Sequence, residues 1–139
     1  MTPSFVLDAS VAITWCFKDE ITPTTQSLLK DLRSKVALVP AWWYVEIANV
    51  LALTERKGRL SNHDLEDFLA VLNRVLVEID NEAPQRAFTH LLPLCRTHGL
   101  TSYDAIYLEL AVRRKLPLAT LDQPLRKAAK KLGVKLLGK

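Results

Sequence analysis

The chain has 139 residues, of which 49% are hydrophobic and 24% are charged, with only four glycines and seven prolines. This composition is typical of one folded domain and excludes a disordered or low-complexity protein. The formal net charge is +4, and residues 101–139 carry nine Lys or Arg beside only three acidic residues. That segment favours a polyanionic partner such as nucleic acid, although a solvated helix face has the same composition.

Strands and helices alternate in the pattern of residues along the chain. Strands are predicted at residues 4–7, 36–39, 77–80 and 118–121, with an edge strand at 134–137. Helices are predicted over residues 9–18, 24–34, 41–57, 61–76, 84–98, 102–115 and 124–132. This alternation predicts an α/β fold, in which residues 1–139 form one domain and helices cover both faces of a mainly parallel sheet.

Nothing in the sequence favours a membrane or an oxidising compartment. The longest apolar stretch, residues 36–53, is interrupted by Pro40 and Glu46, and no basic region precedes the first apolar run. The two cysteines, Cys16 and Cys95, are isolated, so neither a disulfide framework nor a zinc site is expected. We therefore expect a cytoplasmic protein without a membrane partner.

Two carboxylates, Asp8 and Asp122, directly follow the apolar runs at residues 4–7 and 118–121. Ligands of parallel sheets bind beyond the carboxyl ends of the strands, which is where both residues are expected to lie. Each could instead cap the helix that follows it, because Asp is a favoured N-cap residue. These two interpretations remain open for both residues.

Two more carboxylates, Glu46 and Asp104, occupy helical patterns whose neighbours three and four places away are mostly apolar. No Lys or Arg lies three or four places from Glu46, whereas Asp104 could complete a capping box with Thr101. Burying an unneutralised carboxylate costs several kcal/mol. We therefore expect all four acids to converge on a divalent cation, and oxygen ligands favour Mg²⁺ or Mn²⁺.

A cation held by carboxylates suits the hydrolysis of phosphodiester bonds. Ser10 and Thr120 lie two places from the strand-end Asp residues and could orient the ligands or a bound water, or act as simple capping hydroxyls. Trp42 and Trp43 are adjacent, so they cannot face the same way, and whether either contacts a ligand stays open. Four basic residues are candidates for holding an RNA backbone: Arg113, Arg114, Arg126 and Lys127.

Other catalytic chemistries lack their sequence motifs. The chain has no GxSxG, GxxxxGK[ST] or GxGxxG, and its three histidines have no metal-ligand spacing. A phosphatase of the haloacid-dehalogenase type would need a DxD motif after the first strand, where this chain has Asp8-Ala9-Ser10. These absences leave metal-dependent phosphodiester hydrolysis as the main hypothesis.

Four short motifs occur in a fixed order along nearly the whole chain: residues 6–11 (VLDASV), Pro40 with 45–51 (VEIANVL), 103–107 (YDAIY) and 118–122 (LATLD). In these motifs and their spacing the chain resembles the PIN-domain ribonuclease family, in particular the VapC-like toxins of type II (VapBC) toxin–antitoxin systems. The resemblance implies a three-layer α/β/α sandwich, Mg²⁺- or Mn²⁺-dependent endoribonuclease activity, homodimers, and a cognate antitoxin that occupies the active-site groove.

Within that resemblance, the catalytic, metal-binding acids are Asp8, Glu46, Asp104 and Asp122, with Ser10 and Thr120 as auxiliary residues. The alternative hypothesis is a non-catalytic PIN-like module that binds a basic protein segment or RNA. Such a module would bind its partner without Mg²⁺-dependent turnover.

Overall fold

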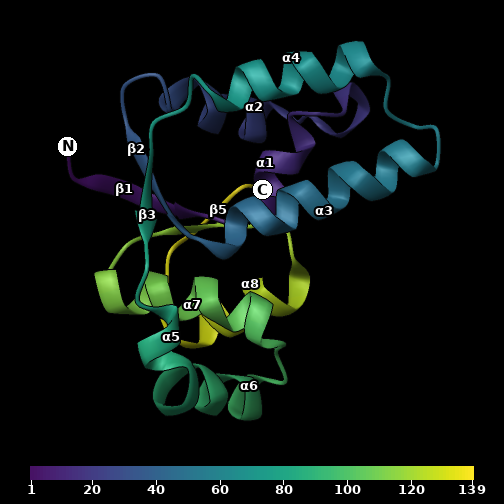
Figure 1. Ribbon diagram of the computed structural model, residues 1–139. Coiled ribbons are helices and arrows are strands. Elements are labelled where there is room, and N and C mark those ends of the chain that lie inside the picture. The colour runs from purple at the N-terminus through teal and green to yellow at the C-terminus, as the bar shows by residue number, and fades with distance from the viewer.

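A five-stranded sheet with the order β3-β2-β1-β4-β5 forms the centre of the computed structural model, which describes residues 1–139 (Figure 1). Every pair of neighbouring strands is parallel, as predicted. The strands are β1 (Pro3–Leu7), β2 (Val36–Pro40), β3 (Val77–Asp80), β4 (Leu118–Ala119) and β5 (Leu136–Leu137).

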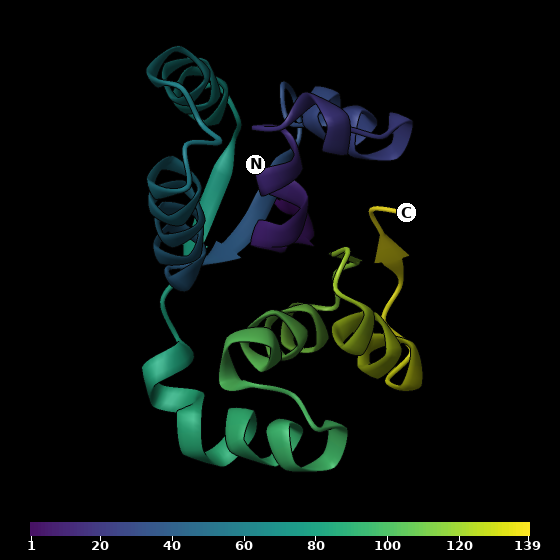
Figure 2. The same cartoon turned by 90° about the vertical axis from the view of Figure 1, so that its right-hand side faces the viewer.

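Helices cover both faces of this sheet, which confirms the predicted three-layer α/β/α sandwich. One layer contains α1 (Ala9–Thr14), α2 (Pro23–Asp31), α3 (Trp42–Arg56) and α4 (Asn62–Leu72). The other contains α5 (Ala83–Arg86), α6 (Leu92–His98), α7 (Ser102–Arg114) and α8 (Gln123–Lys131). Figures 1 and 2 show the two layers on opposite sides of the strands. No helix has both the length and the apolar character needed to cross a bilayer.

Several predicted helices differ from the structure in length or regularity. The helices expected over residues 24–34 and 61–76 end early, at Asp31 and Leu72. The helix expected over residues 9–18 ends at Thr14, whose hydroxyl donates to the Val11 carbonyl, and a 3₁₀ turn follows at Lys18–Glu20. The helix expected over residues 84–98 is interrupted by a π-helical segment, Ala87–Leu91. Pro93 follows this segment, and because proline has no N–H, the regular hydrogen-bond ladder cannot continue through it.

The core lies between the central strands and the helices that pack on them. Val6, Leu38 and Leu118 are completely buried in three adjacent strands, and Trp43 and Tyr107 fill the space against the sheet from α3 and α7. Apolar burial of this kind is the main favourable term in folding. It fixes the carboxyl ends of β1 and β4, from which two of the predicted site residues extend.

The order of the strands reverses between β1 and β4. The chain proceeds from β1 to β2 and β3 in one direction, and from β4 to β5 in the other. Asp8 directly follows β1, and Thr120 directly follows β4, so both lie where the reversal opens the sheet edge. In parallel sheets this reversal is the usual position of a ligand site.

Gly138 lies against the end of β4. Its φ is +108°, a conformation that residues with a side chain rarely adopt. A Cβ atom at this position would be 3.1 Å from the Thr120 carbonyl oxygen and 3.4 Å from the Thr120 nitrogen. Only glycine therefore lets the chain after β5 approach the residue that follows β4.

We expect Gly138→Ala to lower the free energy of unfolding by about 2 kcal/mol, because it adds an overlap with backbone atoms to the cost of an unfavourable φ. The matched control is Gly58→Ala: Gly58 has a φ of +69° but nothing within 4 Å of an added Cβ. The control should cost only about 1 kcal/mol. Urea denaturation measures both losses, and equal losses would contradict the close approach at Thr120.

Candidate active site

Asp8 is a buried carboxylate, only 3% exposed, at the carboxyl end of β1. It occupies the N-cap position of α1 but makes no capping hydrogen bond. Its Oδ2 instead accepts hydrogen bonds from Ser10 Oγ at 2.6 Å and from Thr120 Oγ1 at 2.7 Å. The capping interpretation of Asp8 is therefore wrong, and both predicted auxiliary hydroxyls contact this carboxylate.

The two hydroxyls also bind the turn between β4 and α8. Ser10 Oγ accepts from the Leu121 N–H at 3.0 Å, and Thr120 Oγ1 accepts from the Asp122 N–H at 3.1 Å. Each hydroxyl thus accepts from a backbone amide and donates to Asp8 Oδ2. In such a series of hydrogen bonds, each bond polarises the next and strengthens it. No side chain donates to the other oxygen, Oδ1, and the Ser10 backbone N–H also interacts with this carboxylate.

Glu46 is half-buried on α3 and faces α7. Its Oε1 accepts a hydrogen bond of 2.7 Å from the hydroxyl of Tyr107, which is completely buried on α7. Sequence reasoning missed Tyr107 as a partner. The available signal was its position three residues after Asp104, which places both side chains on one side of that helix.

An aromatic pair joins the same two helices one turn earlier. Trp42 precedes Glu46 by four residues and stacks on Tyr103, with ring centroids 4.7 Å apart and planes 12° from parallel. Tyr103 precedes Tyr107 by the same interval, so α3 and α7 are connected by two successive contacts. Trp43 points the other way and is only 1% exposed, so it packs in the core and does not contact a ligand.

Asp104 and Asp122 are half-buried at the N-termini of α7 and α8. Asp122 does cap its helix, because its Oδ2 accepts from the Leu125 N–H at 3.0 Å. At α7 the cap is Thr101, whose hydroxyl accepts from the Asp104 N–H at 3.2 Å. No return bond from the Asp104 carboxylate completes a capping box, and the partner of this carboxylate is the Thr101 side chain, which lowers its pKa.

The four carboxylates influence one another electrostatically. Burial raises the pKa of Asp8, and the charge of Asp122 raises it further, against the hydrogen bonds from the two hydroxyls. Burial likewise raises the pKa of Glu46 to about 7, with Asp8 and Asp104 adding to the shift against the Tyr107 hydrogen bond. For Asp104, burial and then the charges of Asp122 and Asp8 raise the pKa to about 6. None of the four forms an ion pair.

The site has the types of ligand atom that a metal ion needs, but these atoms are not yet arranged around one position. No three acidic, His or Cys side chains are arranged closely enough to hold an ion as they stand. The donors are nevertheless all oxygen atoms, which match hard cations such as Mg²⁺ or Mn²⁺. Because burial and like charge disfavour their ionised forms, a divalent cation would stabilise them. The residues present therefore fit such an ion in kind.

The four basic candidates differ in what their charges contact. The Arg113 guanidinium binds Asp80, Glu82 and Glu109 at 2.7–3.0 Å. Its positive charge is therefore neutralised by carboxylates of the protein itself. Arg126 Nη1 donates to the carbonyls of residues 120 and 137, which ties the ends of β4 and β5 together. Arg114 lies 3.7 Å from Glu78 at the surface. Lys127 is exposed and makes no ion pair.

Comparison with known proteins supports the fold and its family. A profile of the PIN domain matches residues 5–131. The crystal structure of PAE2754 from Pyrobaculum aerophilum superposes with a TM-score of 0.70 at 24% sequence identity, and the match covers 96% of this chain and 83% of that chain. At that identity the similarity establishes the fold alone. No curated protein matches the sequence.

We expect the metal-free protein to lose stability as the pH rises from about 4.5 to about 7. The pKa of Glu46 increases from 4.5 to about 7 on folding, so the folded state binds more protons in this window and the free energy of unfolding falls. Glu46→Gln should reduce that fall by about 1–2 kcal/mol, because one pKa unit is worth about 1.4 kcal/mol and solvent screens part of it.

Denaturation in EDTA at about pH 5 and about pH 8 measures this difference, with the exposed Glu55 on the same helix supplying the control variant Glu55→Gln. An undiminished fall in the Glu46→Gln protein would contradict the burial of this carboxylate.

We expect Arg113→Ala to lower the free energy of unfolding by about 3–5 kcal/mol, because it leaves the buried Asp80 carboxylate without its cation, while Glu109 keeps only Arg86. The side chains of Arg113, Asp80 and Glu109 are 14%, 8% and 8% exposed. Arg114→Ala is the matched control and should cost less than about 1 kcal/mol, since its ion pair is at the surface. Thermal or urea denaturation measures both losses, and a small loss for Arg113→Ala would mean that the network is solvated.

Proposed function

Because the chain belongs to the PIN domain family, we propose that it is a Mg²⁺- or Mn²⁺-dependent endoribonuclease that hydrolyses RNA phosphodiester bonds. The PIN domain is generally a nuclease fold. The observation that carries the proposal is the set of four carboxylates at the reversal of strand order. Burial, and then the charges of neighbouring acids, raise the pKa of Asp8, Glu46 and Asp104, and no basic side chain forms an ion pair with any of the four. Placing several unpaired carboxylates together is electrostatically costly without a cation, and such groups are typical of functional sites.

In this proposal Asp8, Glu46, Asp104 and Asp122 hold the metal. The bound cation would supply the positive charge that polarises a phosphoryl oxygen and activates a water molecule. Hydroxyl donors engage only Oδ2 of Asp8, and Tyr107 engages only Oε1 of Glu46. Each of these carboxylates therefore keeps one oxygen for the cation or for a proton of the attacking water.

The separation of the carboxylates in the metal-free protein is consistent with this role. Two unit charges about 4 Å apart repel by about 4 kcal/mol at an effective dielectric constant of about 20. Four ionised groups would therefore resist closer approach until a cation offsets their charge. We therefore propose that the full ligand set assembles only when a metal ion binds and offsets this repulsion.

We further propose that the protein is the toxin component of a type II toxin–antitoxin system, inhibited by a cognate antitoxin and active as a homodimer. The motif resemblance supports this biological role. A second support is the apolar surface of α3, where Tyr44, Val45 and Leu53 are 46%, 52% and 43% exposed. Exposed apolar side chains of this size can contribute to a protein–protein contact.

We expect Asp8→Asn and Asp104→Asn each to reduce RNA cleavage by about 100-fold or more, because each removes a charged metal ligand. Neither change should unfold the protein, since both relieve repulsion between like charges. The matched control is Asp67→Asn, which alters an exposed carboxylate on α4. Cleavage of defined RNAs with and without Mg²⁺ or Mn²⁺ tests this, with circular dichroism as the check on folding.

Undiminished metal-dependent cleavage by both variants would reject the proposed site. RNA binding by the wild-type protein without any cleavage under either metal would instead favour the non-catalytic module.

A further inference from the structure

A polar cavity of about 490 Å³ lies between the end of α6 and one face of α8. We call it the basic groove, and it is lined by Thr97, His98, Gln123, Pro124, Lys127, Ala128 and Lys131. No acidic side chain is among these residues, although the chain as a whole has 15. The groove therefore carries a local positive charge that nothing in its walls offsets.

Two lysines supply this charge. Gln123, Lys127 and Lys131 follow one another at intervals of four residues, so they lie along one face of α8. Neither lysine forms an ion pair. Like charges four residues apart destabilise a helix by a few tenths of a kcal/mol. The helix dipole stabilises Lys131, which lies in the last turn of α8, but it does not stabilise Lys127 in the middle of the helix. We therefore infer that the two lysines face an anionic ligand.

The basic groove begins beside the candidate active site. Gln123 and Pro124, which line one end, directly follow Asp122. From there the lysines lead along α8, with a rise of about 6 Å between Lys127 and Lys131. That interval is comparable to the spacing of consecutive phosphates in an extended nucleic-acid strand. A strand with its scissile phosphate at the acidic site could therefore continue into the groove.

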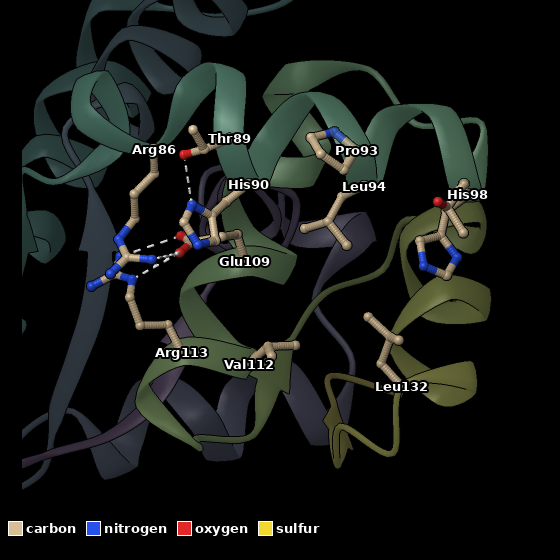
Figure 3. A pocket seen from close by; sticks show the side chains of 11 residues that line it. Arg86, Thr89, His90, Pro93, Leu94, His98, Glu109, Val112, Arg113 and Leu132 are labelled. Carbon is tan, nitrogen blue, oxygen red and sulfur yellow. Dashed lines mark hydrogen bonds and ion pairs between the residues drawn. The ribbon is translucent and has the colours of Figure 1, made fainter.

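The neighbouring cavity differs in its charge. It has a volume of about 530 Å³ and shares Thr97 and His98 with the basic groove. Figure 3 shows His98 and Leu132 at one end and the ion pairs of Arg86 and Arg113 with Glu109 at the other. The arginine charges in this second cavity are thus neutralised within the fold. Of these two neighbouring cavities, the basic groove is the one whose cations are not paired with acidic side chains.

We propose that the basic groove binds the backbone of single-stranded RNA on one side of the cleaved bond, with Lys127 and Lys131 contacting successive phosphates. This inference rests on the proposed ribonuclease function and assigns a substrate-binding surface to it. The compact ammonium groups of lysine bind phosphates as point charges and carry no base specificity. The groove therefore contributes affinity and strand direction, and leaves sequence selection to other contacts.

The test is the salt dependence of RNA binding by a Lys127→Ala/Lys131→Ala protein. Fluorescence polarisation with a labelled single-stranded RNA in EDTA measures binding while the RNA stays intact. Loss of two phosphate contacts should reduce the slope of log K against log salt by about 1.4, because each contact contributes about 0.7 for a single strand. The matched control is Lys18→Ala/Lys30→Ala, which removes two exposed charges from the other helical layer and should leave the slope unchanged.

Equal slopes for the two double variants would overturn the groove assignment, and the ribonuclease proposal would stand if the wild-type protein still cleaves RNA. A wild-type protein that neither binds nor cleaves RNA would overturn both. Polyglutamate serves as a second probe. If the Lys127→Ala/Lys131→Ala protein loses binding to polyglutamate but not to RNA, the groove binds an acidic protein segment and the RNA assignment is wrong.

Discussion

The hydrogen bonds around Asp8 Oδ2 are the interaction on which both the fold and the site depend. A buried carboxylate costs several kcal/mol, and here the cost is offset by two hydroxyls that are themselves polarised by backbone amides. Because Asp8 follows β1 and Thr120 follows β4, the same bonds fix the ends of both strands. Arg126 holds the Thr120 carbonyl from the other side at 2.7 Å. The buried Asp8 carboxylate, which would destabilise a core without these partners, is thereby fixed in position.

The remaining carboxylates are each attached to a different element, which explains why they lie near one another without forming a closed cluster. Glu46 is held by Tyr107, and Asp122 is held by the amide of Leu125 at the start of α8. Asp104 interacts with the Thr101 side chain at the start of α7. The sandwich thus brings acids from both helical layers to one edge of the sheet, while local bonds keep most of them apart. The raised pKa values record the electrostatic cost of that arrangement.

The sequence predicted the parallel sheet well, because short apolar runs followed by polar residues reflect burial on both faces. It could not decide whether Asp8 caps a helix, since its true partner Thr120 is 112 residues away and no local pattern encodes that contact. The same holds for Arg113, whose carboxylate partner Asp80 lies 33 residues earlier, and for Tyr107, which bonds Glu46 across 61 residues. The π-helical segment Ala87–Leu91 was missed because it follows the same apolar spacing as an ordinary helix. The strands and the acidic residues at their ends could therefore be predicted from the local sequence. The side-chain contacts between residues far apart in the chain could not.

The span of chain between Asp8 and Thr120 has a consequence for synthesis of the protein. Thr120 is synthesised 112 residues after Asp8, and Asp122 follows two residues later. Contacts this distant in sequence form late, after the intervening helices have ordered. An unfinished chain consequently lacks an assembled centre. In the proposed nuclease, this order of synthesis would keep a nascent chain inactive until Thr120 and Asp122 are in place.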